Sequence, residues 1–93
     1  MREYFFELPC DDGHKSFHQK ARVRENARGE KLLFSYGTAV CKLDAGGNFV
    51  RLWGGYSATT QRHINSFIRF YGSRQQCGKA AWLKTPVERR PAL

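Results

Sequence analysis

The sequence predicts an α+β fold in which an antiparallel β-meander of three to five strands carries one amphipathic helix and a short C-terminal helical turn. Between residues 16 and 53, polar and apolar residues alternate with period two, as they do on strands buried on one face. From residue 59 to residue 71, apolar residues recur at helical spacing. The length of 93 residues allows one domain, 1–93, which we divide into a core (16–84) and a basic tail (85–93).

The clearest alternation follows an aromatic stretch (3–8) and a turn-forming segment (9–13). It runs from Ser16 to Arg24, with inward positions Phe17, Gln19, Ala21 and Val23 and outward positions His18, Lys20, Arg22 and Arg24. No acid occurs between Lys15 and Arg24, so we expect the outward face of this strand to be basic. A hairpin connection with Gly29 follows it.

Two further apolar stretches continue the meander. In residues 30–36 the alternation favours Leu32, Phe34 and Tyr36 as inward residues against Leu33 and Ser35. Gly37 then separates this stretch from residues 38–43, either as a bulge in one bent strand or as the break between two strands. Residues 44–48 have the composition of a hairpin turn, and the last strand is expected at 49–53.

The helix is predicted from an apolar stripe formed by Ile64, Phe67, Ile68 and Tyr71, which Thr60 extends. Either Ser57 or Thr59 can cap its beginning, and Gly72 stands where a helix-ending glycine belongs. Arg62, Ser66 and Arg69 project away from the stripe. We expect the stripe to pack on Phe17, Val23, Leu32, Phe34 and Val40. Residues 79–84 predict a short helical turn anchored by Trp82, followed by a frayed tail.

Charge is the strongest compositional signal, because 16 Lys and Arg against 8 Asp and Glu give a net charge of +8. The first twelve residues hold one base and four acids, whereas residues 61–93 hold seven bases and one acid. Such clustered positive charge is typical of proteins that bind a polyanion, although it also serves solubility, and an acidic membrane is a weaker option. We predict polyanion or partner contacts at Lys20, Arg22, Arg24, Arg62, Arg69 and Arg74.

The cysteines favour a reducing cytoplasm, because they are three in number and contain no C-x-x-C pair. Cys41 lies in an apolar strand pattern and is expected in the core. Cys10, His14 and His18 have a spacing that could bind zinc on a helix, with Cys77 as a fourth ligand. Turn-forming residues around Cys10 argue against that helix, so the metal site stays an open alternative, and we expect no cofactor.

Catalytic and membrane signatures are missing from the sequence. It contains no P-loop, no G-x-S-x-G, no H-E-x-x-H and no apolar run of membrane-spanning length, so we do not expect an enzyme or a membrane protein. Cys41 and His63 are a poor nucleophile–base pair, since no orienting carboxylate lies near them in sequence. Residues 54–64 could hold a phosphate at the helix N-terminus, or Ser57 could simply cap the helix while His63 bonds the sheet.

Three segments together carry a resemblance to a known family: residues 16–23, residues 33–40 and residues 56–67. The recurring signature is S-Y-x-T-x-V, here at residues 35–40, followed by S-x-T-T-x-x-H-I-x-x-F, here at residues 57–67. Across residues 16–72 the chain resembles an uncharacterised family of small proteins from phages, plasmids and conjugative elements of Gram-positive bacteria. The resemblance implies a mobile-element origin and no established activity. Small proteins of such regions are frequently anti-defence factors, so we expect an anti-CRISPR inhibitor that binds a Cas protein or its guide complex. The alternative is a small DNA- or RNA-binding regulatory protein.

Overall fold

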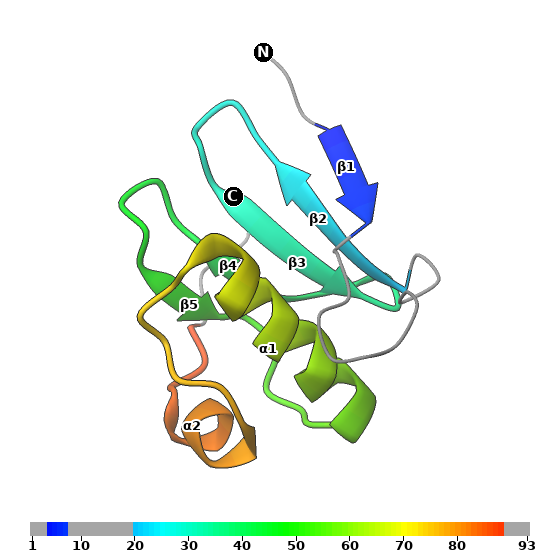
Figure 1. Ribbon diagram of the computed structural model, residues 1–93, viewed down its shortest axis with the longest axis vertical. Coiled ribbons are helices and arrows are strands. Elements are labelled where there is room, and N and C mark those ends of the chain that lie inside the picture. The colour runs from blue at the N-terminus through cyan, green and yellow to red at the C-terminus, as the bar shows by residue number, and fades with distance from the viewer. Residues whose placement is uncertain (1–3, 8–19, 89–93) are drawn as a thin grey trace.

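The computed structural model describes the backbone of residues 4–7 and the backbone and side chains of residues 20–88. Its elements are β1 (Tyr4–Glu7), β2 (Ala21–Glu25), β3 (Lys31–Ser35), β4 (Thr38–Leu43), β5 (Phe49–Arg51), α1 (Ala58–Tyr71) and α2 (Lys79–Lys84). The five strands form one sheet in the order β1-β2-β3-β4-β5, and all neighbours are antiparallel (Figure 1). The predicted α+β meander is therefore confirmed. Of the first predicted strand, residues 16–19 lie outside the described part.

The connections between strands are tight and internally bonded. After β2, the side-chain oxygen of Asn26 accepts from the backbone N–H groups of Arg28 and Glu30. After β4, the carboxylate of Asp44 accepts from the backbone N–H groups of Gly46 and Asn48. Both are local side-chain to backbone bonds of the kind that Asn and Asp form in turns. These turns fix the register of the hairpins on either side of them.

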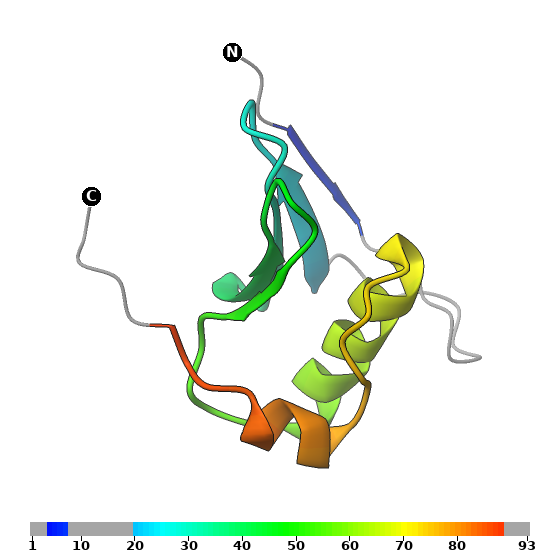
Figure 2. The ribbon, with the colours of Figure 1, turned by 90° about the vertical axis from the view of Figure 1, so that its left-hand side faces the viewer.

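The molecule has two layers, because α1 lies across one face of the sheet (Figure 2). The core between them consists of Ala21, Val23, Leu33, Val40, Cys41, Leu43, Ile64, Phe67, Ile68 and Trp82, with Tyr71, Phe49 and Trp53 packed against it. The stripe predicted for α1 thus faces the sheet, as expected. No helix within residues 20–88 is long and apolar enough to cross a membrane.

The ends of α1 follow the sequence prediction. The Ser57 hydroxyl accepts from the backbone N–H of Thr60 at 3.0 Å, so Ser57 is the N-cap rather than Thr59. Gly72 ends the helix with φ 65°, a left-handed conformation that glycine adopts without steric cost. One expectation for the helix surface was wrong, because Ser66, predicted to project away, is buried.

The orientation of β3 is the main correction. Leu33 and Ser35 face α1 and are buried, whereas Leu32 and Phe34, predicted inward, are half-buried on the opposite face. Tyr36 is 56% exposed instead of lying in the core. Because Leu32, Leu33 and Phe34 are all apolar, composition alone does not say which side of this strand faces the helix.

A bulge in β4 explains why both faces of the hairpin are partly apolar. Leu33 pairs with Cys41 while Phe34 pairs with Ala39, which leaves Val40 as the extra residue on β4. Val40 and Cys41 are consequently both buried although they are consecutive. The chain turns between β3 and β4 at Tyr36 and Gly37, so these are two strands and the irregularity lies at Val40 rather than at Gly37.

The C-terminal segment is attached to the sheet through Arg51 and Trp82. The buried guanidinium of Arg51 lies over the Trp82 ring, 4.3 Å from its centroid, and donates to five backbone carbonyls, including those of Trp82 and Thr85. Trp82 is buried as predicted, and its indole N–H donates to the Gly55 carbonyl. The predicted fraying at residue 85 is wrong for residues 85–88, because Val87 forms a parallel bridge with Arg51. Residues 89–93 lie outside the described part.

Candidate functional site

The sheet face opposite α1, which we call the outer face, carries the polyanion contacts that were predicted on and just before β2. Ala21 and Val23 are buried under α1, so the alternation of β2 directs Arg22 and Arg24 to the other side. Cross-strand pairing brings the outer-face residues of β3, β4 and β5 beside them. The described side chains of the outer face are Lys20, Arg22, Arg24, Glu30, Leu32, Phe34, Lys42 and Val50.

The outer face combines cations with apolar surface. The guanidinium of Arg24 lies 5.6 Å from the ring centroid of Phe34, and Arg22 stands opposite Phe34 in the register. Lys42 lies opposite Leu32 and pairs with Glu30 at 3.1 Å. Among the described side chains of this face, four are cationic and only Glu30 is anionic. On the neighbouring strand, Glu7 stands opposite Arg22 in the register.

Glu30 is held ionised on this face. The Asn26 amide and the Lys42 ammonium both donate to its carboxylate and hold its pKa below the usual range. The Glu30–Lys42 pair therefore neutralises itself at physiological pH, and the positive potential of the described outer face comes from Lys20, Arg22 and Arg24. Lys20 and Arg22 are exposed, whereas Arg24 is half-buried against Phe34.

Phe34, which the alternation of residues 30–36 assigned to the core, instead lies beside the basic residues of the outer face. The true orientation of β3 places its ring among the arginines. Phe34 and Lys42 are thus outer-face residues that sequence reasoning missed. The available signal was the apolar run of β3, which is typical of a strand with apolar residues on both faces.

The predicted helix residues lie elsewhere. Arg62 and Arg69 belong to α1, which covers the inner face of the sheet, so the sheet separates them from the outer face (Figure 2). Arg62 is half-buried and Arg69 is exposed, with its guanidinium 3.7 Å from the Cys77 sulfur. The structure therefore does not join the two predicted basic surfaces into one.

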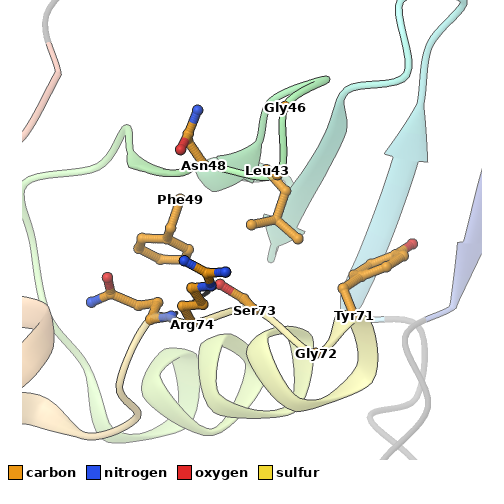
Figure 3. A pocket seen from close by; sticks show the side chains of 10 residues that line it. Leu43, Gly46, Asn48, Phe49, Tyr71, Gly72, Ser73 and Arg74 are labelled. Carbon is orange, nitrogen blue, oxygen red and sulfur yellow. Dashed lines mark hydrogen bonds between the residues drawn. The ribbon is translucent and has the colours of Figure 1, made fainter.

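Arg74 lies in a third place, an open groove of about 630 Å³ between the β4–β5 turn and the end of α1. Leu43 and Phe49 enter this groove from the sheet, Tyr71 enters it from α1, and Arg74 reaches toward the Phe49 ring from the loop (Figure 3). The turn facing Arg74 contains Asp44, whose pKa is lowered chiefly by the backbone N–H of Asn48. A cation and two rings line this groove, but they are separate from the outer face.

At the beginning of α1, Ser57 caps the helix and His63 bonds the sheet, which is the alternative to the phosphate site. Ser57 is occupied as the cap, and the Ser35 hydroxyl lies 3.0 Å from the Thr60 hydroxyl and 2.9 Å from Nδ1 of His63. His63 is only 1% exposed, so its ring serves as a buried link between helix and sheet. These contacts tie the first turns of α1 to the end of β3.

Two predicted reactive features can be examined in the described part of the chain, the Cys41 thiol and a metal-binding cluster. Cys41 is fully buried, and this burial raises the pKa of its thiol well above the usual range, which disfavours a nucleophilic thiolate. Residues 20–88 contain no group of three His, Cys, Asp or Glu side chains that could hold a metal ion. The proposed ligands Cys10, His14 and His18 lie outside the described residues.

These observations define a small two-layer α+β domain whose sheet face opposite α1 is basic and partly aromatic. The chain belongs to DUF8033, a family of unknown function, whose model matches residues 8–84. The match extends from before β2 to the end of α2, and β1 precedes it. No curated protein and no solved structure matches the chain.

Proposed function

We propose that this protein is a small non-enzymatic protein that binds nucleic acid through the outer face of its sheet. The observation that carries the proposal is the presence of Arg22 and Arg24 beside the half-buried Phe34 ring, with Lys20 preceding them on the same strand face. Cations that follow a strand are spaced to contact successive phosphates, and apolar surface between them accepts sugar or base. A surface that serves solubility alone mixes both signs of charge and has no need of an aromatic ring.

The net charge supports the same function through association rate and affinity. A charge of +8 on 93 residues creates a field that attracts polyanions at low ionic strength. Each phosphate that a basic side chain neutralises releases a counterion, so the affinity falls steeply as salt rises. The expected signature is thus binding of naked oligonucleotide that weakens with salt.

The inhibitor of a CRISPR effector expected from the mobile-element resemblance stays a second proposal, set in the cytoplasm of a bacterial host. The acidic first segment and the basic remainder of the chain favour docking on a surface that contains both protein and nucleic acid. Plasmid interference assays with the common effector types test this idea. Interference that stays intact in the presence of the protein would exclude it, whatever the affinity for naked nucleic acid.

The direct test compares two double charge reversals of equal size. Lys20→Glu with Arg22→Glu alters two exposed cations of the outer face, whereas Arg69→Glu with Arg74→Glu alters two exposed cations elsewhere. All four side chains are exposed, so each substitution should change the stability by no more than about 0.5 kcal/mol, which thermal melts verify. Only the first pair should abolish oligonucleotide binding, as measured by fluorescence anisotropy at several salt concentrations.

The two pairs remove the same amount of charge, so a non-specific field effect would weaken both equally. Equal losses would therefore show that net charge, not the outer face, governs binding. A wild-type protein that fails to bind any oligonucleotide at low salt would refute the proposed function itself.

A further inference from the structure

Tyr36 occupies an unusual position at the turn between β3 and β4. It is the one non-glycine residue in the described part of the chain with a positive φ, 52°, and Gly37 follows with φ 85°. Two consecutive residues of positive φ form a type I′ hairpin turn, in which the first position favours Asn, Asp or Gly. A tyrosine there is sterically disfavoured, because its Cβ approaches the neighbouring carbonyl oxygen.

Packing does not require a tyrosine at this turn. The side chain is 56% exposed, the most exposed of the large apolar residues in the described part of the chain. The ring is not part of the cluster of buried apolar residues, and the buried ring that it contacts belongs to His63. A strained, exposed aromatic residue is typical of a functional position.

The ring is nevertheless held in a defined place. Its centroid lies 5.7 Å from that of His63, which is buried and bonded to Ser35, the residue before Tyr36. On the strand side, the Tyr36 backbone N–H donates to the Lys20 carbonyl, and the Lys20 ammonium lies 5.8 Å from the ring centroid. Tyr36 therefore lies at the end of the sheet where Lys20 precedes β2, with its ring close both to His63 of α1 and to the Lys20 ammonium.

We propose that Tyr36 is a stacking platform for an unpaired base, and that the ligand of the outer face is single-stranded nucleic acid. This inference rests on the proposed function. A base that stacks on the exposed ring places its flanking phosphates near Lys20 and Arg22, which the register and the cation contact put at the same end of the face. Stacking needs a base that is free of its partner, so paired strands gain nothing from Tyr36.

The experiment measures binding to labelled single-stranded DNA and RNA of about 12 nucleotides, and to the corresponding DNA duplex, a length within the usual site sizes. Tyr36→Asn removes the ring and inserts a residue that suits a positive φ. We expect it to keep the melting temperature at or above that of the wild type and to weaken single-strand binding at least about fivefold, equivalent to about 1 kcal/mol, the lower end for one stacked base. Duplex binding should not change.

Two matched variants control the test. Tyr36→Phe keeps the ring and loses only the hydroxyl, so single-strand binding should stay within about twofold of the wild type. Phe70→Ala removes another exposed ring, 49% exposed on α1, and should leave binding unchanged. Photo-crosslinking of the wild type to bromouracil-containing oligonucleotides should place the adduct on Tyr36, a readout that does not depend on any variant folding.

The outcomes separate this inference from the proposed function. Single-strand affinity that is unchanged in Tyr36→Asn, or an adduct found only at other residues, would overturn the stacking role while the charge-reversal result still stands. Equal affinity for duplex and single strand would overturn the ligand class. Absence of any binding by the wild type would instead refute the proposed function. The DNA and RNA arms then identify which single strand the face accepts.

Discussion

Replacing Arg51 with methionine tests how the C-terminal segment is held on the sheet. Methionine keeps an unbranched apolar side chain but removes the guanidinium, which donates to five carbonyls and lies over the Trp82 ring. The carbonyl of Trp82 receives the shortest of these bonds, 2.8 Å, in a buried position. Arg51→Met removes these charged donors, although the Trp82 carbonyl still accepts from the Thr85 backbone N–H at 3.2 Å.

The expected loss of stability in Arg51→Met follows from the number of hydrogen bonds that the substitution removes. A hydrogen bond from a charged donor contributes about 1.5–3 kcal/mol, so losing the bonds to Trp82 and Thr85 alone amounts to at least about 3 kcal/mol. A domain of this length has a total stability of about 5–14 kcal/mol. The melting temperature should therefore fall by at least about 12 °C, since each kcal/mol corresponds to about 4–8 °C in domains of this size.

The assay is thermal and urea unfolding, followed by tryptophan fluorescence and far-ultraviolet circular dichroism. Arg22→Met is the matched control, because it makes the same replacement at an exposed arginine of the sheet, and it should change the stability by no more than about 0.5 kcal/mol. Arg51→Lys should fall between the two, since an ammonium cannot reproduce the planar fork. A melting temperature of Arg51→Met within about 4 °C of the wild type would refute the anchoring role.

Two further predictions concern the turns and the buried polar link. The lowered pKa values of Glu30 and Asp44 mean that each carboxylate stabilises the fold above its unfolded-state pKa and loses this contribution as pH falls through the folded value. Stability measured by urea melts should therefore decline from about pH 5 toward pH 3, and Glu30→Gln with Asp44→Asn should flatten that decline; an unchanged slope would contradict the assignment. Ser35→Ala should cost about 1–3 kcal/mol, because it removes a buried partner of both Thr60 and His63; a loss below about 0.5 kcal/mol in the same melts would show that the hydroxyl contributes nothing.

The sequence predicted the features that depend on local periodicity and on helix capping. The stripe through Ile64 and Phe67, the Ser57 cap and the final Gly72 all depend on residues within one helix. The basic outward positions of β2 were equally accessible, because Ala21 and Val23 alternate with Arg22 and Arg24 without ambiguity.

The remaining features depend on contacts that periodicity does not encode. Leu32, Leu33 and Phe34 fit either orientation, and only the bulge at Val40 and the pairing with Cys41 decide which of them meets the helix. Arg51 has the sequence signature of a surface residue, since its burial depends on carbonyls of residues more than thirty positions away. The exposure of Tyr36 was missed for the same reason, because the alternation of residues 30–36 assigned it to the core.

The connection between Arg51 and α2 also has a consequence for the order of folding. Every strand pairs with its neighbour in the chain, so the hairpins close short loops at small entropic cost and should form early. The bonds from Arg51 to Trp82 and Thr85 instead span 31 and 34 residues. They close a loop that contains all of α1, at a larger entropic cost. We therefore expect docking of α2 to come late in folding and its release to come early in unfolding.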